Sequence, residues 1–267
     1  MALRVVSAAA SLPLLILVVW VGGAWFSALV AIAAAVGTLE LRQMARAQGA
    51  RPSVTLAVLL AVTLIALARL VADASPDNAI PPAIAGGAAA LALVWLLMRH
   101  QILTGISGWA ATVAAGVYTG GLLFHAPLLR ELDDGREWVI LLFVVTFSTD
   151  ISAFFVGKAF GKRPLAPTIS PSKTWEGAIG GFGGALAGAI AAVQVLGLDA
   201  TVPQSLALGA LAGVAGQFGD LAVSRMKRIA DVKDSGWLFP GHGGLLDRMD
   251  SIVFNLVVVY YSALWIA

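Results

Sequence analysis

The chain contains nine apolar stretches, each long enough to cross a lipid bilayer as a helix. A transmembrane helix needs about 20 apolar residues, within a range of about 17 to 25. Only 12% of the residues are charged, whereas soluble domains carry roughly 25%. This pattern predicts an all-α, polytopic integral membrane protein with about nine transmembrane helices. The stretches begin near Val5, Ala24, Ser53, Ile80, Gly105, Trp138, Trp175, Gln204 and Ser251.

The connections between these stretches differ in charge. Cytoplasmic loops of membrane proteins are enriched in Lys and Arg. If the N terminus lies inside, 14 of the 17 basic residues fall in inside segments, and the outside connections carry net negative charge. We therefore expect the N terminus inside and the C terminus outside.

Ionisable groups divide the chain into two regions. Residues 1–130 offer mainly apolar helices and are expected to serve packing or dimerisation. Residues 131–267 contain two long inside loops, 150–176 and 220–250, and form the expected catalytic region. The chain has no cysteine, which excludes thiolate metal sites, disulfides and cysteine nucleophiles.

Asp220 follows an apolar run and therefore lies at or near membrane depth. A carboxylate there is costly and indicates function by default. Asp220, Ser224 and Lys227 recur at spacings of three and four, which places them on one helix face. The plain alternative is an ion pair between Asp220 and either Lys227 or Arg228.

Asp247 and Asp250 are spaced three residues apart at the start of the last apolar stretch and share a face. The plain alternative is a favourable interaction with the helix dipole. Mg²⁺ usually binds one or two carboxylates together with waters and phosphates. A helix, a loop and a return into the membrane could bring Asp220 to Asp247. We predict that these two bind the metal and that Asp250 is a further ligand or orients one.

Basic residues and glycines accompany these aspartates, and a phosphorylated substrate with a divalent cation explains the combination economically. Backbone N–H groups of glycine can approach phosphate because no Cβ intervenes. Hydroxyl and ammonium groups next to a helix start, as in the first loop, suit anion binding. The predicted catalytic residues are Asp220, Lys233, Asp247 and Asp250. The predicted substrate-binding residues are Ser170, Lys173, Thr174, Ser224, Lys227, Arg228, Gly241, His242, Gly243, Gly244 and Arg248.

The polar pattern of residues 224–250 resembles a known family. It reads S-x-x-K-R-x-x-x-x-K-D-x-G-x-x-x-P-G-H-G-G-x-x-D-R-x-D and is similar to the signature of phosphatidate cytidylyltransferases, also called CDP-diacylglycerol synthases. The first loop resembles the same family through Asp150, Phe160-Gly161-Lys162 and Lys173-Thr174-Trp175-Glu176-Gly177. Phe154 stands where the family often has Tyr, and Ser172 stands where it often has Lys.

The resemblance implies a multi-pass enzyme of the inner membrane, a homodimer whose active site faces the cytoplasm. Its reaction would join CTP and phosphatidic acid to give CDP-diacylglycerol and pyrophosphate with Mg²⁺, and a second cation is an option. No nucleic-acid partner is expected. Three alternatives remain open: a CTP-dependent enzyme with another lipid acceptor (a prenyl-lipid cytidylyltransferase or lipid kinase), an ion or solute transporter, and a noncatalytic lipid-binding scaffold.

Overall fold

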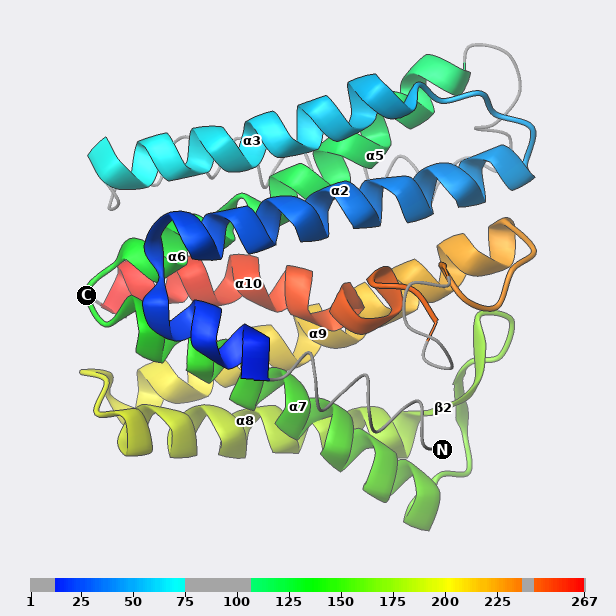
Figure 1. Cartoon of the computed structure of the whole chain (residues 1–267). Helices are drawn as coiled ribbons and strands as arrows, with labels where there is room; N and C mark the ends of the chain where they lie inside the picture. Colours follow the sequence, from blue (N-terminus) through cyan, green and yellow to red (C-terminus); the bar gives the residue numbers. More distant parts are fainter. Residues whose placement is uncertain (1–12, 75–106, 237–242, 267) are drawn as a thin grey trace. The chain divides into compact units, whose positions relative to one another are not determined.

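The chain is described by a computed structural model that covers residues 13–74, 107–236 and 243–266. Its contacts form two compact units. Unit 1 comprises Met1–Arg136 and Met226–Met249, and unit 2 comprises Glu137–Arg225 and Asp250–Ala267. Helices account for nearly all regular structure in both (Figure 1).

Unit 1 is a helical bundle. Helices α2, α3 and α5 pack pairwise (Figure 1), and α6 packs against α2 and α3. Small residues allow this close approach, because Gly116 and Gly120 of α5 lie directly against the backbone of α3 at Ala57 and Ala61. The elements are α2 (Gly23–Ala47), α3 (Val54–Ala74), α5 (Ser107–Leu123) and α6 (His125–Glu131), preceded by helical residues 13–21.

Unit 2 combines long helices with a short hairpin. Its elements are α7 (Gly135–Phe160), β1 (Pro164–Ala166), β2 (Ser170–Thr174), α8 (Trp175–Leu196), α9 (Val202–Ile229) and α10 (Leu246–Ile266). The first residues of α7 and α10 and the last turn of α9 belong to unit 1.

Glycines hold the helices of unit 2 close together. Gly184 of α8 faces Ser148 and Ser152 of α7, and Gly209 of α9 lies against the Ala185 carbonyl group of α8. Gly219 of α9 similarly lies against α10. The small residues of α8 thus allow close approach to both α7 and α9.

The expected loop 150–176 is partly regular structure. Helix α7 continues to Phe160, and an antiparallel hairpin of β1 and β2 follows, pairing Pro164 with Thr174 and Ala166 with Ser170. These strands were not predicted from the sequence, because segments of three and five residues that each contain a proline carry no clear alternation. The hairpin leads directly into α8.

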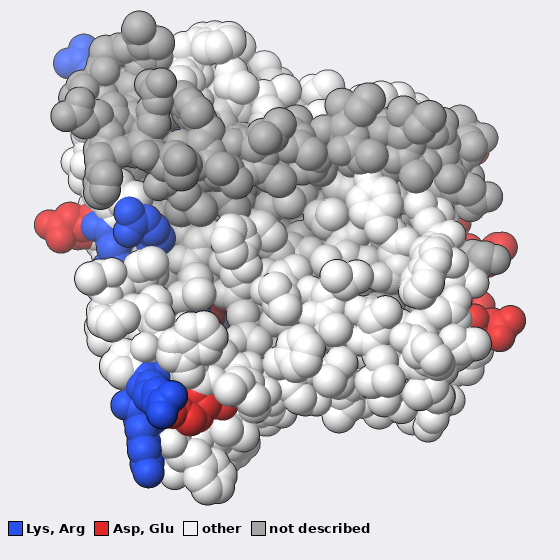
Figure 2. Space-filling view, turned by 180° about the vertical axis from the view of Figure 1, so that it is seen from behind, with Lys and Arg blue, Asp and Glu red and all other residues white. Residues whose placement is uncertain are grey.

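Seven of the helices among the described residues are long and apolar enough to cross a membrane. Their starts agree with seven of the nine expected stretches; the stretch near Ile80 and the start of the stretch near Val5 lie outside the described residues. Many large apolar side chains are exposed, and Trp25 and Trp109, both 73% exposed, lie near helix starts, as in an aromatic belt. On the face seen in Figure 2, most of the described surface is uncharged. The protein is a multi-pass, helical membrane protein.

Two neighbouring glycines of α8 provide a matched test of this packing. A Cβ added at Gly184 would meet the Ser148 carbonyl oxygen at 2.5 Å and Ser152 Cβ at 2.6 Å, whereas a Cβ at Gly183 would meet nothing within 4 Å. Gly184→Ala should therefore lower stability by about 1–3 kcal/mol. Gly183→Ala should leave it unchanged or slightly higher, because alanine favours helix. Thermal unfolding in detergent measures both; equal effects would contradict close α7–α8 packing.

Candidate functional site

In unit 1, the carboxylate of Asp247 is held by groups from the last turn of α9 and from the chain between α9 and α10. Lys227 Nζ lies 2.6 Å from Oδ1. The other oxygen, Oδ2, accepts bonds from the backbone N–H of Ser235 at 2.8 Å, the hydroxyl of Ser235 at 2.9 Å and the N–H of Gly244 at 3.0 Å. The side chains of Lys227 and Asp247 are only 13% and 9% exposed. We call these four residues, together with Glu40, the Asp247 cluster.

Two of the signature glycines, Gly243 and Gly244, are required by these close contacts. Gly243 has a φ of 82°, which favours glycine, and a Cβ on it would meet Asp247 Oδ2 at 2.8 Å. A Cβ on Gly244 would meet both carboxylate oxygens of Glu40 at 2.6 Å. The Gly-Gly pair therefore brings the backbone close enough to bond with two carboxylates.

Glu40 is a member of the cluster that was not predicted from the sequence. It lies on α2 and is 5% exposed. Its Oε1 accepts from Leu245 N–H at 2.7 Å, and its Oε2 accepts from Leu246 N–H at 2.8 Å and from the Ser235 hydroxyl at 2.9 Å. A signal was present: Glu40 is the only acidic residue among residues 1–72 and lies in an apolar stretch.

In unit 2, a second group of charged residues brings together three helices and the hairpin. Lys173 of β2 forms an ion pair with Asp220 of α9, and the Ser224 hydroxyl donates to Asp220 at 3.4 Å. Asp150 of α7 and Asp250 of α10 both interact electrostatically with Asp220 and Lys173. We call these five residues the Asp220 cluster. Three carboxylates around one ammonium group leave excess negative charge, which attracts cations.

The plain ion-pair alternative for Asp220 is wrong as far as Lys227 is concerned. Asp220 pairs with Lys173, and Lys227 pairs with Asp247. The sequence could not reveal this exchange of partners, because it depends on how the hairpin and the start of α10 fold back. Asp150, which the resemblance included but the predicted site did not, also lies in the Asp220 cluster.

The remaining predicted site residues lie in varied settings. Thr174 caps α8, since its hydroxyl oxygen accepts from Gly177 N–H at 3.1 Å. Ser170 lies on β2 at its pairing with Ala166. Three basic residues are exposed, and Gly241 and His242 lie outside the described residues. The exposed residues are Arg228, Lys233 and Arg248.

The carboxylate oxygens available as metal ligands in both clusters suit a hard cation. Among the described residues, no three His, Cys, Asp or Glu side chains converge into a ready-made metal cage. Mg²⁺ does not require one, because it retains waters and usually binds one or two carboxylates together with substrate phosphates. Carboxylates from either cluster, with lysines beside them for phosphate, therefore fit Mg²⁺.

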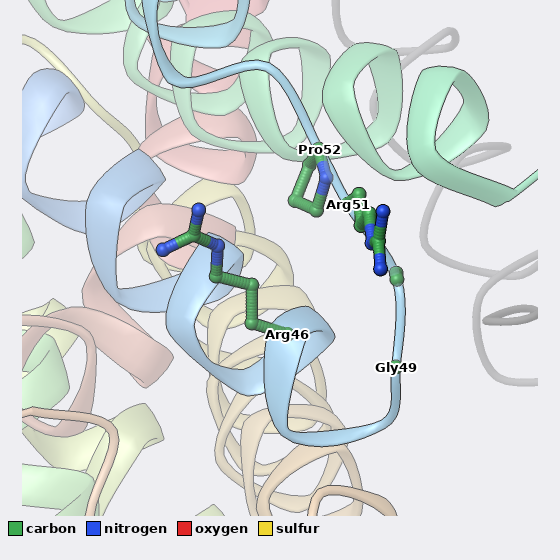
Figure 3. A pocket seen from close by; sticks show the side chains of 5 residues that line it. Arg46, Gly49, Arg51 and Pro52 are labelled. Atoms are coloured by element: carbon green, nitrogen blue, oxygen red, sulfur yellow. The ribbon is translucent and has the colours of Figure 1, made fainter.

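A further concave surface lies where α2 ends. A pocket of about 460 Å³ is lined by Arg46, Gly49, Ala50, Arg51 and Pro52. Figure 3 shows Arg46 on the helix and Arg51 on the following loop. Both arginines are exposed, as basic residues near the surface of a membrane are. None of the lining residues belongs to either cluster.

The fold and the two clusters define a multi-pass membrane protein with buried or half-buried carboxylate–lysine groups suited to cations and phosphates. Residues 2–265 match the Cytidylyltransferase family, and the chain belongs to that family. A phosphatidate cytidylyltransferase of Synechocystis sp. is 33% identical over 286 residues, covering 97% of this chain and 94% of the relative.

Two further relatives match over a shorter region. A phosphatidate cytidylyltransferase of Brucella abortus is 42% identical over 156 residues, 57% of this chain and 56% of the relative. One of Bacillus subtilis is 41% identical over 152 residues, 55% of each chain. The resemblance found in the signature is thus confirmed at the level of the family.

The cap of α8 gives a test at the hairpin. Thr174→Ala removes the acceptor for Gly177 N–H and should cost about 1 kcal/mol of stability, whereas Thr174→Ser retains the hydroxyl and most of that stability. Thermal unfolding of the two purified variants separates these outcomes. An equal loss of stability in both would show that the threonine methyl group, and not the cap, is what matters.

Proposed function

We propose that this chain transfers the cytidylyl group of CTP to phosphatidic acid, giving CDP-diacylglycerol and pyrophosphate in phospholipid biosynthesis. The observation that carries this proposal is the nearly full-length match to a phosphatidate cytidylyltransferase. The two clusters support it, because lysines paired with carboxylates at low exposure suit a reaction between two phosphorylated substrates.

The reaction makes one phosphorus–oxygen bond and breaks another. A phosphate oxygen of phosphatidic acid attacks the α-phosphorus of CTP, and the bond to the β-phosphate breaks with its electron pair leaving on pyrophosphate. The attacking phosphate is already largely ionised near pH 7, so no strong general base is required. Both reactants are anionic, and the main demands on the protein are charge neutralisation and positioning.

We assign Asp220 and Asp247 to Mg²⁺ binding, with Asp250 as a further ligand or an orienting residue. Mg²⁺ would supply neutralisation and orientation of the phosphate oxygens. Lys173 and Lys227, which contact these two aspartates, are proposed to hold phosphate groups as well. Asp150 adds negative charge to the same group.

The remaining predicted residues complete the proposed substrate site. The exposed basic residues are proposed to bind phosphates, and the glycine-rich turn with His242 to shape the nucleotide pocket. Ser170, Thr174 and Ser224 are candidates for either substrate. The basic residues are Arg228, Lys233 and Arg248.

The proposal includes an orientation and an assembly. We propose that the enzyme lies in the inner membrane as a homodimer, with both clusters on the cytoplasmic side. The excess of Lys and Arg in segments assigned to the inside supports this orientation. The same charges argue against a transporter, whose ionisable groups would be spread through the depth of the bilayer.

The metal assignment is tested with Asp220→Asn and Asp247→Asn, because each substitution removes one negative charge at nearly constant volume. Each should lower CTP-dependent formation of CDP-diacylglycerol by about 10²-fold or more and raise the Mg²⁺ concentration required. Asp199→Asn, at an exposed position between α8 and α9, is the matched control and should behave as the unsubstituted protein. Near-normal rates in both cluster variants would refute the assignment.

The lipid acceptor is tested by offering the purified protein labelled CTP with phosphatidic acid, a prenyl phosphate or diacylglycerol. We expect CDP-diacylglycerol and pyrophosphate from phosphatidic acid alone. A CDP-linked prenyl lipid would indicate the other acceptor, and release of CDP with phosphorylated diacylglycerol would indicate a kinase. No turnover of CTP with any lipid would favour a binding scaffold.

The orientation can be tested with single cysteines, since the chain has none of its own. Lys162→Cys, before β1, should react with a membrane-impermeant thiol reagent only when the cytoplasmic side is open. Asp199→Cys should react from the opposite side in intact cells. Reversed labelling of the pair would overturn the proposed orientation.

A further inference from the structure

Glu40 occupies an unusual position for a carboxylate. It lies on α2, in the region expected to serve packing or dimerisation, and is 5% exposed. A buried carboxylate is costly unless it is hydrogen-bonded. The bonds it makes are to residues of the signature segment, more than 190 positions away in sequence.

The three bonds accepted by Glu40 reach both ends of one loop. The Ser235 hydroxyl lies on the side that follows α9, and the N–H groups of Leu245 and Leu246 lie at the start of α10. The first N–H groups of a helix have no partner within the helix. Glu40 therefore caps α10 from another helix and ties it to Ser235.

Ser235 connects Glu40 to Asp247. Its hydroxyl oxygen lies 2.9 Å from Glu40 Oε2 and 2.9 Å from Asp247 Oδ2, and its backbone N–H also donates to Asp247. A hydroxyl has one hydrogen to donate, so the two carboxylates share one donor. A change at Glu40 must consequently alter how Ser235 holds Asp247.

The glycines around Glu40 indicate how closely the carboxylate is enclosed. A Cβ on Gly236 would meet Glu40 Oε1 at 2.6 Å, and a Cβ on Gly244 would meet both oxygens at the same distance. The backbone thus approaches the carboxylate closely from two sides. A side chain that only filled space would not require such a close approach.

We propose that Glu40 is a positioning residue: it anchors Ser235 and the first turn of α10 and thereby sets the position of Asp247 and of its partner Lys227. Glu40 itself touches neither substrate nor metal in this proposal. Its importance for turnover rests on the proposed function, since it acts through Asp247. The anchoring itself does not depend on which reaction the cluster serves.

The experiment compares Glu40→Gln with Thr38→Val. Glutamine keeps the size of the side chain, but its amide nitrogen replaces one acceptor oxygen and faces N–H donors. Thr38 is also buried on α2, but its hydroxyl bonds with Thr119 and Ala34, not with the loop. The control therefore matches the loss of a buried polar interaction without touching the anchor.

Glu40→Gln should lower kcat/KM by about 10- to 100-fold, as when a residue that orients a metal ligand is removed, and should raise the Mg²⁺ concentration required. Thr38→Val should leave both near the values of the unsubstituted protein. In the double variant Glu40→Gln/Ser235→Ala, the loss should be no larger than that of the more damaging single change. Unchanged kinetics and Mg²⁺ dependence in Glu40→Gln, or fully additive losses in the double variant, would overturn the proposal.

Hydrogen–deuterium exchange of the protein in lipid nanodiscs supplies a readout that does not need turnover. The amides of residues 244–247 should exchange at least about tenfold faster in Glu40→Gln and not in Thr38→Val, because a lost cap promotes local opening. Gly236→Ala, which pushes on the same carboxylate from the loop, should act similarly. If the amides of Glu40→Gln and Gly236→Ala were as protected as those of the unsubstituted protein, the anchor would be refuted, whether or not CTP is turned over. Faster exchange in these variants without any CTP turnover in the unsubstituted protein would refute only the proposed reaction.

Discussion

The ion pair between Lys227 and Asp247 determines how the chain between α9 and α10 is folded. Two charges at such low exposure have lost much of their hydration, and their attraction compensates only if further hydrogen bonds satisfy the remaining positions. Ser235 and Gly244 supply those bonds to the second oxygen of Asp247. Glu40 in turn accepts hydrogen bonds from the N–H groups of Leu245 and Leu246. Ser235 lies within hydrogen-bond distance of both Glu40 and Asp247, so each carboxylate helps to hold a donor of the other.

The same constraint explains the glycines of the signature without reference to substrate. Gly243 and Gly244 are small because two carboxylates lie where a side chain would begin. In the described arrangement the N–H of Gly244 is directed to Asp247. A role of this turn in phosphate binding, which was the first interpretation of the sequence, is therefore additional to its role in shaping the Asp247 cluster.

Much of the architecture could be predicted because twenty apolar residues in a row are a strong signal. The expected starts at Ala24, Trp175 and Gln204 lie within a few residues of α2, α8 and α9. The pairing of charges could not be predicted in the same way. Whether Lys173 or Lys227 meets Asp220 depends on how segments fold back on one another, and neither helical spacing nor charge counting contains that information.

Glu40 escaped prediction for a related reason: the groups it bonds with lie more than 190 positions away in sequence. The hairpin was missed because its strands are too short to show alternation. The signature itself was informative because it gathers Lys227, Gly244 and Asp247 within a short span of sequence, which favours their meeting in space. What a linear pattern lacks is the member contributed from a distant helix.

The anchoring of α10 by α2 has a consequence for how this protein can be recombined. The first apolar helices are not a freely exchangeable membrane module, because α2 supplies the acceptor oxygens of Glu40 and the later segment supplies the donors. A chimaera that joins the second half of this chain to unrelated hydrophobic helices would inherit Ser235, Leu245 and Leu246 without the carboxylate that binds them. A chimaera that keeps this anchor needs a glutamate at the position equivalent to Glu40. If the two halves were expressed as separate fragments, one would contain the carboxylate and the other the groups that donate to it.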